Sequence, residues 1–269
     1  MTTKISIDPI TRLEGHGRVD LFLDEEGRLA NAYLVIPELR GFEKFCEGRP
    51  VEEMAQITQR ICGVCPIAHH MAAAKAGDAV YKLEIPPAAR KLREMMYTAF
   101  FVADHATHFY ALGGPDFVVG PDAPKAERNI LGVVRKVGRE IGAQVMQLLQ
   151  DNHEITAILG GRYIHSVGAI IGGMSKPLTP EGRDRIVERA RRSVETARFS
   201  LRLFDEIVLQ NRAYVDLILS DTFTHRTYYM GLVDEHNRVN FYDGQVRVVG
   251  PDGRELVKYA PQEYLDVVA

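Results

Sequence analysis

Cysteine is scarce in this sequence, and long apolar runs are absent. The 269 residues include 3 cysteines, and an odd, low number of cysteines argues against a disulfide framework and favours a reducing compartment. The stretch MTTKISIDPITRLEGHG contains no apolar core of a secretory signal. No segment approaches the roughly 20 apolar residues that a membrane-spanning helix requires. We therefore expect the chain to be cytoplasmic, without direct membrane insertion.

No excess charge of either sign marks the chain. It carries 33 basic and 36 acidic residues, for a formal net charge of -3. The two signs are well mixed, so we expect no binding to nucleic acid or to an anionic membrane surface. With 46% hydrophobic and 26% charged residues, the composition is typical of a globular protein with a sizeable core.

Strand-like patterns occur at both ends of the sequence. Near the start, ISI, RVDLFLD and RLANAYLVI are separated by the turn-like stretches TRLEGHG and EEG. Near the end, RVNFYDGQVRVVGPDGRELVKYA contains three strand-like stretches separated by glycine-containing turns. The proline-bounded stretch PELRGFEKFCEGRP, residues 37–50, predicts a loop.

Apolar residues at helical spacing dominate the middle of the sequence. A first helix is predicted from residue 51 to the cysteines near residue 65, on the spacing of Met54, Ile57, Ile61 and Val64. Further helices are predicted over residues 68–83, 87–112, 125–149 and 179–210. The stretches GGPDFVVGPDAP and GGRYIHSVGAIIGGMSKP predict breaks between them.

These patterns together predict the fold class. Thr179 is placed to cap the last long helix, with Pro180 in its first turn. We expect an α+β fold, with a mostly helical body and small antiparallel β segments at the N-terminus and near the C-terminal end. We expect residues 1–269 to form a single domain.

Two of the three cysteines lie in RICGVCPIAHH, residues 60–70. Thiolates are favoured beside a cation such as Arg60, and Cys62 and Cys65, three residues apart at a helix end, can chelate one soft metal. A redox dithiol usually lies in a strand-loop-helix setting, and a structural zinc site usually has a second C-x-x-C motif, which is absent here. The residues alone favour a metal site, and a redox dithiol and an unliganded thiol pair stay open.

Four stretches together resemble a known family. DPITRLEGHGRV, RGFEKFCEGR, RICGVCPIAH and DHATHFY occur in this order, and as a set they resemble the large, catalytic subunit of nickel-iron hydrogenases. Residues 60–69 match the family's N-terminal cysteine signature, R-x-C-G-x-C-x-x-x-H. RGFEKF is more similar to cytoplasmic, cofactor-coupled members. The resemblance implies a large-subunit-like fold and the reversible heterolytic cleavage of dihydrogen to protons and electrons.

The resemblance also implies a nickel-iron centre at the cysteine pair. By position, Cys62 is similar to a terminal nickel ligand and Cys65 to a nickel-iron bridge, with carbon monoxide and cyanide on the iron. Soft, electron-donating thiolates suit a redox metal. His69 matches the family histidine that hydrogen-bonds a metal-bound sulfur and so tunes the metal. His70 is interpreted instead as a satisfied polar residue on a helix.

Glu14 in TRLEGHG matches the family's proton-relay glutamate. Heterolytic cleavage leaves a proton for a base, assigned in the family to a nickel thiolate, and this carboxylate takes the proton onward. A buried carboxyl group with a raised pKa suits that task. We favour this role over that of a surface glutamate in a turn.

Three more residues match family positions around the centre. Glu43 in RGFEKF is similar to a ligand of a structural magnesium ion, a hard cation that prefers oxygen; an exposed loop charge is the close alternative. Asp104 in DHATHFY is similar to a carboxylate that pairs with an arginine over the metal. Arg60 is expected to pair or hydrogen-bond near the site, whereas Cys46 matches no ligand and is expected to be a buried or half-buried free thiol.

The sequence departs from the family in one respect. Family members carry a second cysteine pair near the C-terminus, in a D-P-C-x-x-C-x-x-H setting, and this sequence has no cysteine after Cys65. We therefore expect the 269 residues to be the N-terminal part of a large subunit, as a fragment, one piece of a split subunit, or a degenerate copy. On that basis we expect the chain to be inactive alone.

The resemblance implies partners as well as a site. An iron-sulfur small subunit would carry electrons away, because this chain has no ligands for clusters of its own, and further electron-transfer subunits would extend the hetero-oligomer. The alternative function is that of a metal-free homologue, either a quinone-pocket subunit of a complex I-like oxidoreductase or a docking scaffold. The presence of both Cys62 and Cys65 argues against the quinone-pocket subunit.

Overall fold

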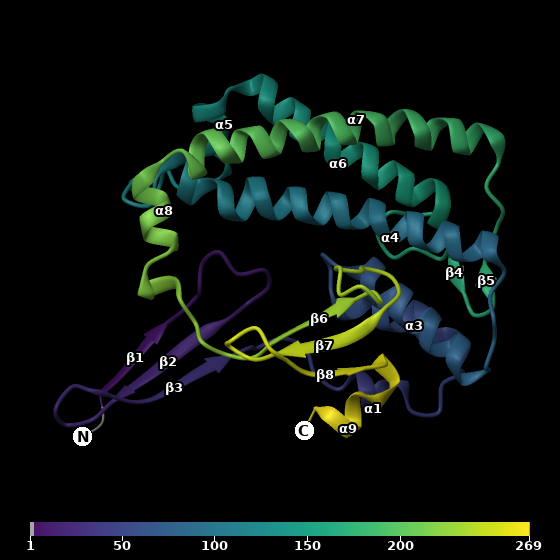
Figure 1. The fold of residues 1–269 in the computed structure, drawn as a ribbon, viewed down its shortest axis with the longest axis horizontal. Coiled ribbons are helices and arrows are strands. Elements are labelled where there is room, and N and C mark those ends of the chain that lie inside the picture. The colour runs from purple at the N-terminus through teal and green to yellow at the C-terminus, as the bar shows by residue number, and fades with distance from the viewer. Residues whose placement is uncertain (1–2, 269) are drawn as a thin grey trace.

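The computed structural model describes residues 3–268 and is shown in Figure 1. The α-helices are α1 (Phe42–Cys46), α2 (Met54–Ile57), α3 (Pro66–Val80), α4 (Pro87–Thr107), α5 (Ile130–Val137), α6 (Arg139–Gly160), α7 (Pro180–Phe204), α8 (Arg212–Ile218) and α9 (Tyr264–Val267). The strands are β1 (Thr3–Ile7), β2 (Arg18–Leu23), β3 (Leu29–Val35), β4 (Ala169–Ile170), β5 (Gly173–Met174), β6 (Tyr229–Val233), β7 (Gln245–Val249) and β8 (Glu255–Tyr259). Short 3-10 helices cover Val51–Glu53, Thr58–Ile61, Asp221–Phe223 and Pro261–Glu263, and π-helical turns cover His108–Gly113, Pro115–Val119 and Asp205–Leu209.

Three long helices form the main layer of the molecule. In Figure 1, α4, α6 and α7 run alongside one another, and α3 lies on the opposite side of α4 from α7. The apolar side chains that these helices share form the core, which includes Ile67, Met71, Met96, Ala99, Ile155, Leu159 and Ile186. Burial of these side chains holds the layer together, because each fully buried isoleucine, leucine or methionine contributes about 1.5–3 kcal/mol.

Two antiparallel three-stranded sheets flank the helices. Strands β1, β2 and β3 pair in that order, and strands β6, β7 and β8 pair in that order. The first sheet projects at the lower left of Figure 1, and the second lies beneath α4 and beside α3. This arrangement confirms the predicted α+β class, with a mostly helical body and small sheets near its two ends. Within residues 3–268, none of the helices is both long and apolar enough to cross a membrane.

The predicted helix from residue 51 to the cysteines is wrong in its form. The segment breaks into a 3-10 turn, the short helix α2 and a second 3-10 turn that ends at Ile61. Cys62 is extended, with φ -131° and ψ 132°, and Cys65 stands at the N-cap of α3. Pro66 explains why α3 begins after Cys65, because proline disfavours helical geometry in the preceding residue and suits the first position of a helix.

Two other predicted boundaries differ from the structure. The helix expected over residues 125–149 is divided between α5 and α6 by Gly138, whose φ of 91° lies in the left-handed region. The side chain of Asn129 starts α5 by accepting a hydrogen bond from the backbone of Gly132. GGPDFVVGPDAP was expected to break the chain, and its first part instead continues α4 as π-helical turns as far as Val119.

Two further expectations are wrong, one after the first sheet and one in the second sheet. Residues 37–50 were predicted as a loop, and they contain the short helix α1. The first strand of the second sheet was predicted in RVNF, where the structure has a single bridge between Val239 and Val233. The first strand of the second sheet is instead β6, whose residues lie earlier in the sequence than RVNF. Thr179 caps α7 as predicted, because its side chain accepts a hydrogen bond from the backbone of Gly182 at 3.0 Å.

His70 joins three segments of the fold. Its ring is fully buried, and Nδ1 lies 2.8 Å from the carbonyl oxygen of Ala55 on α2. The backbone N–H of Ala169 on β4 donates to Nε2 at 3.1 Å, so the ring is the tautomer that carries its proton on Nδ1. His70 is therefore the satisfied polar residue on a helix that the sequence indicated.

A buried ion pair anchors the hairpin of β4 and β5. The guanidinium of Arg93, which is fully buried, donates to both carboxylate oxygens of Asp78 at 2.6 and 3.4 Å. Arg93 also donates to the carbonyls of Ile170 and Gly173, and the N–H of Gly172 donates to Asp78 at 2.7 Å. The pair thus links α3, α4 and the hairpin.

Asp78→Ala is expected to lower the free energy of unfolding by about 3–5 kcal/mol, because it leaves the buried Arg93 charge without its partner. Urea unfolding followed by circular dichroism measures the change. Asp184→Ala is the matched control, since Asp184 pairs with Arg183 at the surface with both side chains more than half exposed, and it should leave the unfolding midpoint near that of the parent. An equal loss of stability in both variants would contradict the assigned role.

Candidate metal centre

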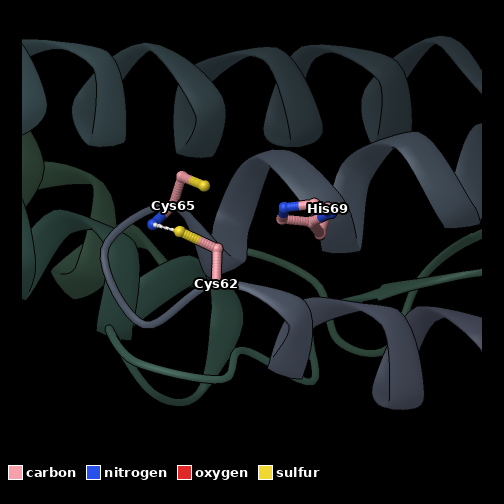
Figure 2. A group of neighbouring side chains, drawn as sticks. All are labelled: Cys62, Cys65 and His69. Carbon is pink, nitrogen blue, oxygen red and sulfur yellow. Dashed lines mark hydrogen bonds between the residues drawn. The ribbon is translucent and has the colours of Figure 1, made fainter. Parts of the chain in front are cut away.

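The loop between α2 and α3 brings two thiols and an imidazole together. Cys62 precedes the loop, Cys65 ends it at the N-cap of α3, and His69 follows on the first turn of that helix, four residues later. One ligand atom from each of the three side chains lies within 4.8 Å of the others. Figure 2 shows both sulfurs and the imidazole beside the start of α3. Residues i and i+4 of a helix share a face, so the spacing of Cys65 and His69 accounts for their proximity.

Cys62 lies against the start of α3 and accepts a hydrogen bond there. The backbone N–H of Cys65 donates to Cys62 Sγ at 3.3 Å, drawn as the dashed line in Figure 2. Hydrogen bonds and the dipole at a helix N-terminus stabilise negative charge. The prediction placed the cysteines at the end of a helix, and the structure places them at the beginning of the next one, where an anion is better accommodated.

Cys65 lies in surroundings that disfavour its negative charge in the absence of a cation. Burial raises the pKa of Cys65 to about 12, and the neighbouring Cys62 thiol and the charges of Glu14 and Asp104 act in the same direction. A metal cation inverts this balance, because it deprotonates a coordinating thiol outright. Soft thiolates, an imidazole and nearby carboxylates together fit a cationic transition-metal group.

Arg60 does not supply the cation that the sequence placed beside the thiols. Its side chain is exposed, and its guanidinium turns back along the chain to donate to the carbonyl oxygen of Gln56. A role for Arg60 in hydrogen bonding near the site stays a prediction.

The two predicted carboxylates approach Cys65 from different elements. Glu14 lies in the loop between β1 and β2, and Asp104 lies on α4; the charge of each one raises the pKa of Cys65. Glu14 is exposed and Asp104 is half-buried, so the expectation that Glu14 is buried is wrong. Neither carboxylate forms a hydrogen bond or an ion pair with another residue between positions 3 and 268.

Sequence reasoning missed a pocket next to the thiols. The pocket has a volume of about 200 Å³ and is lined by Asp104, Thr107, His153, Thr156 and Tyr163, together with apolar residues from the loop and from α4. The His153 ring stacks on Tyr163 with ring centroids 4.6 Å apart, and burial lowers the pKa of His153. His153 belongs to no motif, so only the packing of α6 against α4 places it here.

The remaining predicted residues lie on α1. Glu43 is exposed in the first turn of this helix, and Cys46 is a half-buried free thiol, as expected. Among residues 3–268, Cys62, Cys65 and His69 are the one group of three or more histidine, cysteine or acidic side chains with ligand atoms this close together. Neither α1 residue belongs to that group, so a magnesium site at Glu43 stays a prediction.

Comparisons with known proteins match nearly the whole chain. A family model described as nickel-dependent hydrogenase matches residues 40–139, and one described as HoxL-like matches residues 4–39. One subunit of the vhu F420-non-reducing hydrogenase of Methanocaldococcus jannaschii is 44% identical over 265 residues, which cover 98% of this chain and 62% of that protein. The beta subunit of the NAD-reducing hydrogenase HoxS of Cupriavidus necator is 32% identical over 278 residues, 99% of this chain and 56% of that protein.

A solved structure has the same fold. The crystal structure of an NAD+-reducing NiFe hydrogenase in the H2-reduced state superposes with a TM-score of 0.87 and 34% identity, covering 98% of this chain and 58% of that chain. The chain thus spans between 56% and 62% of the length of these two relatives and of the solved structure.

Proposed function

This chain belongs to the nickel-dependent hydrogenase family, and from that premise we propose that it provides part of the catalytic site for the reversible heterolytic cleavage of dihydrogen. The convergence of Cys62, Cys65 and His69, with ligand atoms within 4.8 Å of one another, carries the proposal. In this proposal, Cys62 and Cys65 would hold a nickel-iron group through their thiolates, in the terminal and bridging roles that the resemblance implies for them. The nickel-iron group, when bound, supplies the Lewis acidity and redox capacity that polarise dihydrogen.

The chain's own residues handle the proton. A thiolate sulfur at the site accepts it, since thiolates are basic groups at the point where the proton is released. Glu14 then receives the proton and passes it outward. The exposure of Glu14 supports this outward step, because its carboxylate is in contact with solvent while its charge is still felt at Cys65. His69 orients a metal-bound sulfur, and Asp104 provides a fixed negative charge beside the centre.

The rest of the ligand set comes from polypeptide outside these 269 residues. The sequence contains 3 cysteines, and Cys46 lies outside the group at the site, so two thiolates are available here. Carbon monoxide and cyanide complete the iron coordination, because no side chain provides such ligands. A magnesium ion at Glu43, and a single domain over residues 1–269, are further parts of the proposal.

An iron-sulfur small subunit and further electron-transfer subunits accept the electrons, and the complex is cytoplasmic in this proposal. Exposed apolar side chains support burial against other polypeptide, because an isolated globular protein rarely leaves so many uncovered. The most exposed are Leu39 (80%), Leu219 (74%), Leu265 (73%), Leu201 (71%) and Val239 (71%). With two cysteines at the metal centre, the chain has too few thiols left to hold a cluster.

The proposal is tested on the assembled protein, purified with its remaining large-subunit polypeptide and partner subunits. We expect nickel by elemental analysis, with iron in excess of nickel because the iron-sulfur clusters of the partner subunits also contain iron. We also expect hydrogen-dependent dye reduction and catalytic exchange between dihydrogen and deuterated water. A preparation that contains no nickel and reduces a quinone analogue would instead support the metal-free homologue.

A further inference from the structure

The loop that carries Glu14, residues 8–17, has its ends fixed by hydrogen bonds. The N–H of Ile10 donates to the carbonyl of Gly17 at 2.9 Å and closes the base of the loop. The N–H of His16 donates to Glu38 Oε1 at 2.8 Å. Glu14 has no hydrogen bond or ion pair to another residue among positions 3–268, so its carboxylate is placed only through the position of the loop backbone from which the side chain extends.

Arg12 supplies the remaining constraint on this loop. Its Nε and Nη2 donate to the two carboxylate oxygens of Asp116 at 3.1 and 3.3 Å, and Nη2 also donates to the carbonyl of Arg128 at 2.7 Å. Arg12 has a φ of 62°, in the left-handed region. A long side chain is found there when tertiary contacts impose the conformation, and these three hydrogen bonds are such contacts.

Asp116 is itself held in place. It lies in the π-helical turns that continue α4, and α4 carries Asp104. Arg128 Nη1 lies 3.6 Å from Asp116 Oδ1 and donates to the carbonyl of Pro121 at 2.7 Å. The Arg12–Asp116 pair therefore ties the Glu14 loop to the same helical segment that positions Asp104 beside Cys65.

We propose that the Arg12–Asp116 pair is a positioning device that holds the Glu14 carboxylate toward Cys65, and this proposal rests on the proton-relay role assigned to Glu14 above. Both side chains of the pair are about one-third exposed (33% and 34%), so the pair adds little stability. The pair acts by fixing the orientation of the loop. A two-pronged guanidinium–carboxylate contact fixes direction as well as distance, which a lysine ammonium does not reproduce.

The first test uses Arg12→Gln, Arg12→Lys and Asp116→Asn in the assembled hydrogenase. Each variant should lower the catalysed exchange between dihydrogen and deuterated water on the order of 10- to 100-fold. The reason is that a displacement of a catalytic group by about 1 Å has such an effect on catalysis. Nickel and iron content and the KM for dihydrogen should stay at parent values. In a Glu14→Gln background, Arg12→Gln should cause no further loss, because both changes act through one carboxylate.

A second readout is independent of catalysis. Arg12→Gln should increase backbone amide hydrogen exchange in residues 10–17, measured by mass spectrometry, because the loop loses its contact with the π-helical turns. Arg28→Gln is the matched control: Arg28 also pairs with aspartate, at 3.0 Å from Asp24, in the turn between β2 and β3. It should change neither the amide exchange of the loop nor the catalytic rate.

The outcomes separate this proposal from the proposed function. Parent catalytic rates and unchanged loop exchange in Arg12→Gln would overturn the positioning role. An equal loss of rate with and without Glu14, or loss of nickel, would overturn it as well. If Glu14→Gln itself keeps the parent rate, the relay assignment fails, and Arg12 then has no proton step to position.

Discussion

Cys65→Ser is expected to abolish nickel retention and hydrogen activity together. A serine hydroxyl stays protonated where a thiol coordinates as thiolate, and its hard oxygen is a poor ligand for a soft metal. Cys65 is the N-cap residue of α3, and its side chain makes no capping hydrogen bond, so the substitution removes the ligand and leaves the loop in place. Elemental analysis and hydrogen-dependent dye reduction on the assembled protein provide the measurements. Cys62→Ser should have the same result.

Cys46→Ser is the matched control for this prediction. Cys46 is a half-buried free thiol on α1 and lies outside the group formed by Cys62, Cys65 and His69. We expect it to leave metal content and activity at parent levels. Full nickel occupancy with normal turnover in Cys65→Ser would refute the assignment of the metal site.

Glu14→Gln is expected to reduce turnover and hydrogen-deuterium exchange together, by on the order of 100-fold or more, as loss of a general acid–base group does. Glutamine keeps the shape and hydrogen-bonding capacity of the side chain and removes the ionisable group. Glu14 is exposed and makes no ligand contact among residues 3–268, so metal content should stay at the parent value.

Glu26→Gln provides the control for a lost surface carboxylate. Glu26 pairs with Arg28 at 3.1 Å in the turn between β2 and β3, and its loss should leave both rates unchanged. Exchange at the parent rate in Glu14→Gln would mean that protons leave the centre by another route. The pocket that contains Asp104 and His153 would then be the first place to look.

Local signals predicted those parts of the fold that local chemistry controls. Proline starts located α4 and α7. The threonine-proline start of α7 was correct because its hydrogen bonds are made within four residues. Gly138 was missed as a helix boundary because glycine is tolerated inside helices, and only its observed φ of 91° shows that the chain turns there.

The parts of the candidate site that residues close in sequence form were predictable. The parts that form where distant segments pack together were not. The pair Cys62 and Cys65, with His69 one turn later, is a local arrangement. The spacing of the cysteines indicated the pair, and the resemblance to the family added His69. The direction of the Arg60 side chain depends on the carbonyl of Gln56, to which its guanidinium donates, in an irregular segment. The exposure of Glu14 and the approach of His153 depend on how the first sheet and α6 pack, which no local pattern encodes.

The hydrogen bond between Ala169 and His70 has a consequence for the order of events during synthesis. Its two residues are separated by 99 positions in the sequence. Arg12 and Asp116, which also contact each other, are separated by 104 positions. Ribosomes extend a chain at about 5–20 residues per second, so the thiols precede the residues that brace α3 by roughly 5–20 s. During that interval the cysteine loop is a free, reactive dithiol on a nascent chain, and its protection from oxidation is a matter of timing as much as of structure.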